Sequence, residues 1–475
     1  MQHTCFGSST CVCYLRFCGH VHTLQPRLDR IMARLSPSDA DGSSFVAATR
    51  SGESPRVYLE RCISRIEEIE RDVQAFTAFS IQAARTAADA SALRWEAGHP
   101  LSPIDGMPIG VKDIIETKDF PTEMGSPLFS GWRAGCDAAS VSALREAGAI
   151  VVGKTVTTEF AATVPGSTRN PHDLSRTPGG SSSGSAAAVG SGMLAAALGT
   201  QVVGSIIRPA SYCGCVGFKP TVGALNRGGS HDFFSQSCLG VLAQTPGDAW
   251  AVAREIAQRV GGDPGSAALS ERTDPFVGGK PGSVAVLETG GWSRVSDEVK
   301  TLFHRWLSQL SEVGVRVMTR RELPELDALE RALSDALELT RSINAWESRW
   351  PLKAYRALGD GLSDVLLDRL VIAEKMSVAQ YTDAVARREA VRRLHSSLHG
   401  KCDALVTLSA PDCAPVGLAS TGDPAFAVPA SLLGAPAVSI PLLKAHGLPL
   451  GIQVIGFQAC DSDMFGIARW LASRN

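Results

Sequence analysis

A lysine in an apolar stretch and two serines in glycine-rich loops are the residues of this chain best suited to covalent chemistry. Lys112 lies in a stretch with β-strand character, between Val111 and Ile114. A buried lysine has a lowered pKa, so its neutral amine can accept a proton near pH 7. Ser181 lies 69 residues beyond Lys112, and Ser205 lies 24 residues further. Together the three favour a serine nucleophile with a lysine base, whereas each alone would indicate a surface lysine or a turn serine.

Small residues surround both serines. Gly179–Gly184 forms a first loop, and Gly199–Pro209, with Gly204-Ser205 at its centre, forms a second. Glycine permits sharp turns and close approach of the backbone to a ligand. Between the loops, Ser185–Val189 and Met193–Leu198 are predicted to be helical, because Ala and Leu are strong helix formers. We therefore expect backbone N–H groups and hydroxyls of both loops to be presented at one site.

Three stretches resemble motifs of the amidase signature family. Gly106–Asp113 is similar to the family's lysine strand, and Thr177–Ala186 to its Gly/Ser loop. Gly204-Ser205, followed by Arg208-Pro209-Ala210, is similar to its nucleophile loop. The similarity runs from about Ser36 to the end of the chain. It implies an α/β protein with the amidase-signature fold, a large mixed β-sheet covered by helices on both faces.

The resemblance also implies a mechanism. Ser205 would attack the carbonyl carbon, neutral Lys112 would be the base, and Ser181 would relay the proton from Ser205 and later to the leaving amine. In the family the Ser181 position carries a cis peptide bond. The oxyanion hole would be formed by the backbone N–H groups of Val202, Val203, Gly204 and Ser205. The implied activity is hydrolysis of a small-molecule carboxamide to a carboxylate and ammonia or an amine, without a metal or organic cofactor.

The nucleophile loop departs from the family pattern at two points. Val202 and Val203 stand where relatives usually have Thr and a small residue, and β-branched side chains restrict the backbone and crowd a loop. Arg208 lies one position later than in many relatives, as it does in some small-acid amidases. Arg208 could bind a substrate carboxylate by a two-pronged contact, or pair with an internal Asp or Glu.

Two other functions share the fold. Amidotransferase subunits of the A type, which pass ammonia from glutamine to an acylated tRNA, usually read Asp-Thr-Gly-Gly-Ser-Ile-Arg around the nucleophile. Residues 201–208 of this chain read Gln-Val-Val-Gly-Ser-Ile-Ile-Arg, which argues against that function. A non-catalytic binding protein with the amidase fold is the other alternative, and the two valines are its only support.

Two further motifs fit their structural context poorly. Gly148–Thr155 satisfies the pattern of a phosphate-binding loop, but its apolar, β-branched centre predicts a strand instead. Ser182 lies in a G-x-S-x-G pattern, which requires a preceding strand, whereas Thr168–Pro178 is polar and predicts a loop. Neither motif is expected to be functional.

Composition narrows the range of partners. The 475 residues contain 46 Lys and Arg and 48 Asp and Glu, a formal net charge of −2, which gives no reason to expect nucleic acid or an anionic membrane as partner. No apolar run approaches the length of a membrane span. Eight of the 12 cysteines are scattered through the body of the chain, which predicts reduced thiols and a cytoplasmic protein. A small amide is the expected partner, and a homodimer is left open.

The first 35 residues are predicted to be a disordered or atypical extension, and residues 36–475 the amidase signature domain. The extension contains Cys5, Cys11, Cys13 and Cys18, followed by His20 and His22, at a spacing that matches no common zinc finger. Periodicity predicts helices at residues 57–69, 81–95, 140–147 and 461–472, and through most of 297–399. Strands are predicted at residues 108–115, 149–153, 281–287, 404–408, 437–442 and 452–455.

The residues that would line the substrate site are scattered. Thr122–Trp132, His231–Phe234 and Asn344–Trp350 are candidates, but the sequence does not orient them. The aromatic residues among the last two groups could face substrate or pack as ordinary core and rim residues. These aromatic residues are Phe233, Phe234, Trp346 and Trp350.

Overall fold

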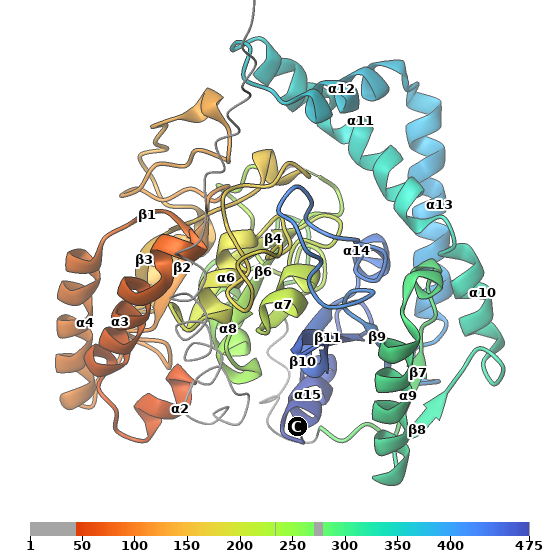
Figure 1. Ribbon diagram of the computed structural model, residues 1–475, viewed down its shortest axis with the longest axis horizontal. Helices are drawn as coiled ribbons and strands as arrows, with labels where there is room; N and C mark the ends of the chain where they lie inside the picture. The colour runs from red at the N-terminus through yellow and green to blue at the C-terminus, as the bar shows by residue number, and fades with distance from the viewer. Residues whose placement is uncertain (1–43, 233, 270–278, 475) are drawn as a thin grey trace, which may run out of the picture. The chain divides into compact units, whose positions relative to one another are not determined.

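An 11-stranded mixed sheet organises the computed structural model, which describes residues 44–232, 234–269 and 279–474 (Figure 1). The strands lie in the order β1-β3-β2-β4-β6-β5-β10-β11-β9-β7-β8. Their bounds are β1 Phe76–Phe79, β2 Pro108–Lys112, β3 Ile150–Thr155, β4 Ala196–Gln201, β5 Val216–Lys219, β6 Cys238–Ala243, β7 Ser283–Val286, β8 Arg316–Met318, β9 Ala404–Leu408, β10 Ala437–Ala445 and β11 Leu448–Ile455. Strand β2 runs parallel to β3 and β4, and β7 runs parallel to β8 and β9, while the other neighbours are antiparallel.

Helices cover the sheet on both faces. They are α2 Phe45–Arg50, α3 Pro55–Val73, α4 Ile81–Glu96, α5 Ala139–Glu146, α6 Ser183–Gly190, α7 Ile207–Cys213, α8 Pro246–Val260, α9 Asp297–Glu312, α10 Pro324–Ala332, α11 Ala336–Arg356, α12 Asp364–Lys375, α13 Val378–Ser396, α14 Val428–Leu433 and α15 Asp461–Ala472. Helices α6 and α7 contact each other and the central strands, and α8 and α15 form a second such pair. Helices α11, α12 and α13 pack together at the edge of the view in Figure 1.

The α/β fold predicted from the motifs is confirmed, together with most of the predicted elements. The predicted helix at 57–69 lies within α3, where Ser54 accepts a hydrogen bond from the backbone N–H of Arg56 and Pro55 occupies the first turn. The predicted helix at 461–472 has the bounds of α15. Central strands such as β2, β3 and β9 are buried at every residue, so they appear in the sequence as short apolar runs.

The helix predicted at Met193–Leu198 is wrong. Helix α6 ends at Gly190, and the chain continues as β4 from Ala196. Strand β4 lies between β2 and β6, and all six of its residues are buried. Helix propensity is a weak preference, and pairing in the centre of a sheet overrides it. The second predicted loop is also shorter than expected, because β4 extends to Gln201 and α7 begins at Ile207.

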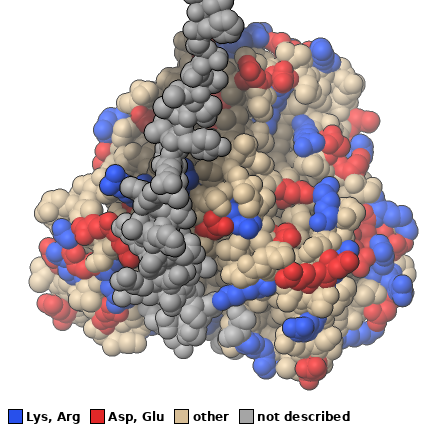
Figure 2. Space-filling model, viewed as in Figure 1, with Lys and Arg blue, Asp and Glu red and all other residues tan. Residues whose placement is uncertain are grey.

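Some expectations concern segments that the structure does not describe. The predicted extension, residues 1–35, lies outside the described residues, together with its cysteines and histidines. Of the helices in the described ranges, none combines the length and apolar character that a membrane crossing requires. The eight cysteines in the described residues are free thiols, and most of them are buried. On the molecular face in Figure 2, basic and acidic side chains are interspersed.

We expect the buried carboxylate of Asp248 to be a major anchor of α2. It accepts hydrogen bonds from the Ser44 hydroxyl and from the backbone N–H groups of Phe45 and Val46, each at 3.0 Å. The substitution Asp248→Ala leaves these buried donors without a partner and should lower the free energy of unfolding by about 2–4 kcal/mol. Urea denaturation followed by tryptophan fluorescence measures this loss. Asp89→Ala, which removes an exposed ion-pair partner of Arg56, is the control and should cost less than about 1 kcal/mol. Equal losses in the two variants would contradict the anchoring role.

Candidate active site

Lys112 is the last residue of β2 and is fully buried. Its strand lies between β3 and β4, so the side chain cannot reach solvent past a sheet edge. The Lys112 Nζ atom lies 2.7 Å from Ser181 Oγ and 2.8 Å from Thr200 Oγ1. Two hydroxyls therefore surround the amine, and one of them belongs to the serine expected to relay protons.

Burial lowers the pKa of the Lys112 amine from 10.5 to about 7, and the Asp232 carboxylate acts in the opposite direction. A charged ammonium is poorly solvated at a buried position, so the neutral amine becomes populated near neutral pH. Asp232 is itself buried, and its Oδ1 atom accepts a hydrogen bond from the Ser230 hydroxyl. Asp232 lies within His231–Phe234, which the sequence offered only as substrate-lining residues, because no spacing relates it to Lys112.

The loop that carries Ser181 requires its glycines. The peptide bond between Gly180 and Ser181 is cis, as the family resemblance implies. Gly179 has a φ of +83°, and a Cβ atom there would lie 2.8 Å from Cα of Pro209. A Cβ atom on Gly184 would lie 2.1 Å from the carbonyl oxygen of Ala75. The Gly179–Gly184 loop is therefore packed tightly against its neighbours.

The loop that carries Ser205 is held by three polar side chains. Gln201 Oε1 accepts hydrogen bonds from the backbone N–H groups of Ile206 and Ile207, at 2.8 and 3.0 Å. Gln201 Nε2 also donates to Ser431 Oγ, at 2.9 Å. Strand β4 and helix α14 therefore fix the second half of the loop, where α7 begins.

Two carbonyl groups of the same loop accept hydrogen bonds from side chains of other segments. Gln236 Nε2 donates to the carbonyl oxygen of Val202 at 2.9 Å, and Ser431 Oγ donates to that of Val203 at 2.9 Å. In a planar trans peptide the C=O and the following N–H point in opposite directions. Fixing these carbonyls therefore fixes the N–H groups of Val203 and Gly204, which are expected oxyanion-hole donors. Sequence reasoning missed Gln236 and Ser431, which lie on other segments.

The two valines fit this backbone. None of residues 202–205, all of which the structure describes, has a positive φ, so the loop does not demand glycine at Val202 or Val203. Val203 packs against the apolar cluster that includes Ile343 of α11 and Val428 of α14. At Gly204, by contrast, a Cβ atom would lie 2.9 Å from that of Ala427. The loop therefore demands glycine at position 204 but not at Val203, whose side chain packs in the apolar cluster.

Arg208 joins the two serine loops. Its buried guanidinium donates from one terminal nitrogen to the carbonyl oxygen of Gly180 at 2.8 Å and to Thr421 Oγ1 at 3.0 Å. Within the described residues Arg208 has no ion pair with an Asp or Glu, and its buried Nε atom has no hydrogen-bond partner. The backbone N–H of Ser182 also approaches the carbonyl oxygen of Ser205, at 3.4 Å. The structure thus joins Lys112 to Ser181, while Arg208 and the backbone of Ser205 are bonded to the residues on either side of Ser181.

A second buried lysine explains the motif that resembled a phosphate-binding loop. Lys154 lies in β3, and its Nζ atom lies 3.1 Å from Asp113 Oδ1 and 2.6 Å from Thr122 Oγ1. Burial raises the pKa of the Asp113 carboxyl to about 6 and lowers the pKa of Lys154. This pair fixes the turn that follows Lys112. Gly148–Thr155 ends in this strand and supplies no phosphate-binding loop.

No metal site accompanies these residues in the described part of the chain. There, no group of three or more His, Cys, Asp or Glu side chains is arranged to hold a metal ion. His231, at the start of a candidate substrate-lining segment, lies with its Nε2 atom 3.0 Å from Glu116 Oε1.

Comparisons with known proteins identify the family and the fold. A family model described as Amidase matches residues 58–464. The A-type subunit of glutamyl-tRNA(Gln) amidotransferase from Anaeromyxobacter sp. (strain K) is 32% identical over 493 aligned residues, covering 93% of this chain and 96% of the relative. A crystal structure of an amidase superposes with a TM-score of 0.75 at 29% identity, over 90% of this chain and 98% of that one. The peptide amidase of Stenotrophomonas maltophilia superposes with a TM-score of 0.75 at 26% identity, over 93% and 98%.

Because the family model spans most of the chain, this protein belongs to the amidase (amidase signature) family. The resemblance to the amidase signature family inferred from the sequence is thereby confirmed. Membership defines a class of enzymes that cleave carbon–nitrogen bonds, by hydrolysis or by transfer of ammonia.

The titration of Lys112 should appear in the pH dependence of amide cleavage. The neutral amine is the form that accepts a proton, so kcat/KM should rise with pH through about 7 as the ammonium loses its proton. The Asp232 carboxylate favours the ammonium, so Asp232→Asn should lower this apparent pKa and extend activity to lower pH. Asp89→Asn, which changes an exposed carboxylate, is the control and should leave the profile unchanged. If the acid limb of the pH profile has the same apparent pKa in Asp232→Asn as in wild type, the coupling between Asp232 and Lys112 is contradicted.

Proposed function

We propose that this protein is a hydrolase of small-molecule carboxamides, with Ser205 as nucleophile and Ser181 and Lys112 as its proton relay. The observation that carries the proposal is the 2.7 Å contact between Lys112 Nζ and Ser181 Oγ at a fully buried position. A lysine whose pKa is lowered to about 7 is a competent base for a serine hydroxyl, which itself would stay protonated in water.

The proposed reaction has two halves. Ser205 Oγ forms a bond to the substrate carbonyl carbon while its proton passes to Ser181, whose own proton passes to Lys112. The carbonyl oxygen becomes an oxyanion, which accepts hydrogen bonds from the N–H groups of residues 202–205. The carbon–nitrogen bond then breaks, and Ser181 returns a proton to the departing amine. Water attacks the acyl-enzyme by the same route, releasing the carboxylate and restoring Ser205.

Arg208 is proposed to contribute to substrate binding. Its Nε atom is buried without a partner in the described residues, and a polar group of this kind gains free energy when a ligand supplies an acceptor. A substrate carboxylate would supply one. The same guanidinium already donates to the carbonyl oxygen of Gly180, so a bound carboxylate would also stabilise the Ser181 loop.

An amidotransferase subunit is the second candidate. The curated relatives support it, since the A-type subunit of one glutamyl-tRNA(Gln) amidotransferase is 32% identical to this chain. The nucleophile loop argues for the hydrolase, because Gln201, Val202 and Val203 replace the residues usual in those subunits. The two candidates share the first half-reaction and differ in whether released ammonia is handed to a partner subunit.

Ammonia release from a panel of small primary amides, including malonamate, glutamine and aryl amides, tests the proposal. Wild type should release ammonia from at least one amide, and Ser205→Ala and Lys112→Met should each lose at least about 10³-fold in kcat. Ser183→Ala, a serine of the same Gly/Ser loop whose hydroxyl donates to the carbonyl oxygen of Val156, is the control. Retained turnover in Ser205→Ala would exclude this nucleophile.

A fluorophosphonate probe and purification from the native host separate the alternatives. Covalent labelling of wild type but not of Ser205→Ala, with a single chain recovered, supports the hydrolase. Turnover of glutamine only, together with copurified partner subunits, supports the amidotransferase. Failure of both labelling and ammonia release would favour the non-catalytic binding protein.

A further inference from the structure

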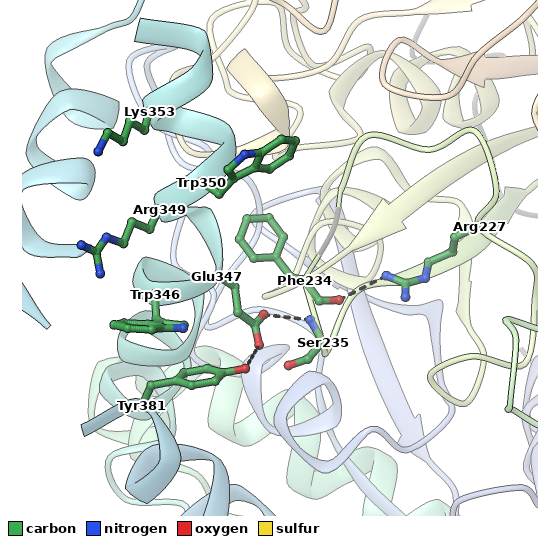
Figure 3. Close-up of a pocket in the computed structure, with 9 residues that line it drawn as sticks. All are labelled: Arg227, Phe234, Ser235, Trp346, Glu347, Arg349, Trp350, Lys353 and Tyr381. Carbon is green, nitrogen blue, oxygen red and sulfur yellow. Dashed lines mark hydrogen bonds between the residues drawn. The ribbon is translucent and has the colours of Figure 1, made fainter. Parts of the chain in front are cut away.

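A pocket of about 640 Å³ opens between helix α11 and the segment that precedes β6 (Figure 3). Its walls include Phe234 and Ser235 on one side, and Trp346 and Trp350 of α11 on the other. This volume lies in the range typical of small-molecule sites. Of the four aromatic residues whose role the sequence left open, Phe234, Trp346 and Trp350 line this pocket from its two sides, and Phe233 lies outside the described residues.

The α11 wall is a stripe of residues along the helix. Trp346, Arg349, Trp350 and Lys353 all line the pocket and lie on neighbouring turns at spacings of three or four residues. In Figure 3 the Trp350 side chain is directed toward Phe234, whereas those of Arg349 and Lys353 leave α11 in the other direction. Aromatic and cationic side chains therefore alternate along about two turns. A stripe of this composition suits a ligand that has both a flat ring and a negative charge.

The charged side chains that line the pocket differ in whether they have a hydrogen-bond or ion-pair partner within the protein. Glu347 accepts hydrogen bonds from the backbone N–H of Ser235 at 2.8 Å and from the Tyr381 hydroxyl at 2.9 Å. Arg227 Nε lies 2.6 Å from Asp263 Oδ2. Arg349 and Lys353 have no ion-pair partner in the residues that the structure describes. The unbalanced charge of the pocket is thus positive.

The aromatic rings that line the pocket also differ in whether another side chain of the protein already stacks on them. Trp346 stacks on Tyr381 with 5.4 Å between ring centroids, and the Arg349 guanidinium lies 5.4 Å from the centre of the Trp346 ring. Trp350 is 73% exposed, and it extends from α11 toward Phe234 in Figure 3. An apolar ring open to solvent beside a second aromatic side chain can stack with a ligand ring.

Both walls of the pocket belong to segments that also form hydrogen bonds or apolar packing with the loop that carries Ser205. Gln236, the residue after Ser235, donates to the carbonyl oxygen of Val202. On α11, Ile343 belongs to the apolar cluster against which Val203 packs, and Trp346 lies three residues further along the helix. The Gln236 hydrogen bond therefore places the Phe234–Ser235 wall of the pocket next to the loop that carries Ser205.

We propose that this pocket binds the distal part of the amide substrate, an aromatic ring that carries a carboxylate or another anionic group. The inference rests on the proposed amidase function, since it assigns the substrate class of that site. The ring lies against Trp350 and Phe234, and the anionic group pairs with Arg349 and Lys353. Rate and affinity at Ser205 then depend on groups remote from the scissile bond.

Matched substrates test the charge preference. Wild-type kcat/KM should be at least about 5-fold higher for 3-(4-carboxyphenyl)propanamide than for its 4-acetyl analogue, or for 4-acetamidobenzoate than for 4-acetylacetanilide. The double variant Arg349→Gln/Lys353→Gln should lose that preference, with kcat/KM for the neutral analogues changed less than about 2-fold. The preference should also fall as salt is raised. Arg341→Gln removes an exposed charge of α11 outside the pocket and should preserve it.

The aromatic part is tested by Trp350→Ala. This variant should lose at least about 5-fold in kcat/KM for the aryl amides and less than about 2-fold for an aliphatic amide of equal length. Equal losses for aryl and aliphatic amides, or no carboxylate preference in wild type in either series, would overturn the proposal.

Binding to Ser205→Ala separates this proposal from the proposed function. Titration with 3-(4-carboxyphenyl)propanamide should quench tryptophan fluorescence, with Kd raised about 5-fold or more by Arg349→Gln/Lys353→Gln. Such binding in a protein whose wild type cleaves no amide would sustain the pocket and exclude the amidase. Cleavage of amides with no effect of the double variant on Kd or kcat/KM would exclude the pocket and sustain the amidase.

Discussion

The site depends on keeping a lysine amine out of water. Lys112 is fully buried at the end of β2, and a charged ammonium there is destabilised relative to solvent. Two features reduce that cost. Hydroxyls of Ser181 and Thr200 lie at hydrogen-bonding distance, and the lowered pKa lets the group be neutral near pH 7. The same burial that destabilises the ammonium therefore yields the neutral amine that the proposed serine mechanism requires as its base.

Burial of this lysine constrains the sheet around it. Strand β2 must have a neighbour on each side, which β3 and β4 supply in parallel. Packing at this point is close, since a Cβ atom on Gly110 would lie 2.6 Å from Leu194 Cδ1 and 2.8 Å from Thr155 Cγ2. The chain then returns along β4 to Thr200, one of the two hydroxyl partners of the amine. The same strand leads directly into the loop that carries Ser205.

Sequence patterns named the proposed reacting groups, but not the groups that hold them in place. Lys112, Ser181 and Ser205 are carried by short motifs, and local strand periodicity predicted β2 and β3. Gln236 and Ser431 could not be found in this way, because each acts on the Val202–Val203 carbonyls from a distant segment. The prediction at β4 failed for a related reason. Its alanines favour a helix locally, and only pairing with β2 and β6 makes them a strand.

The segments that hold the oxyanion loop are also the segments that form the aromatic and cationic pocket. Gln236 fixes a loop carbonyl while Ser235, its neighbour, lines the pocket. Ile343 packs in the apolar cluster that contacts Val203, whereas Trp350 on the same helix is largely exposed. In the proposed mechanism the inward contacts fix the N–H groups of the oxyanion loop, so they should tolerate little change. The outward stripe carries no such requirement, so substitutions there can alter the substrate class while the N–H groups beside Ser205 stay in place.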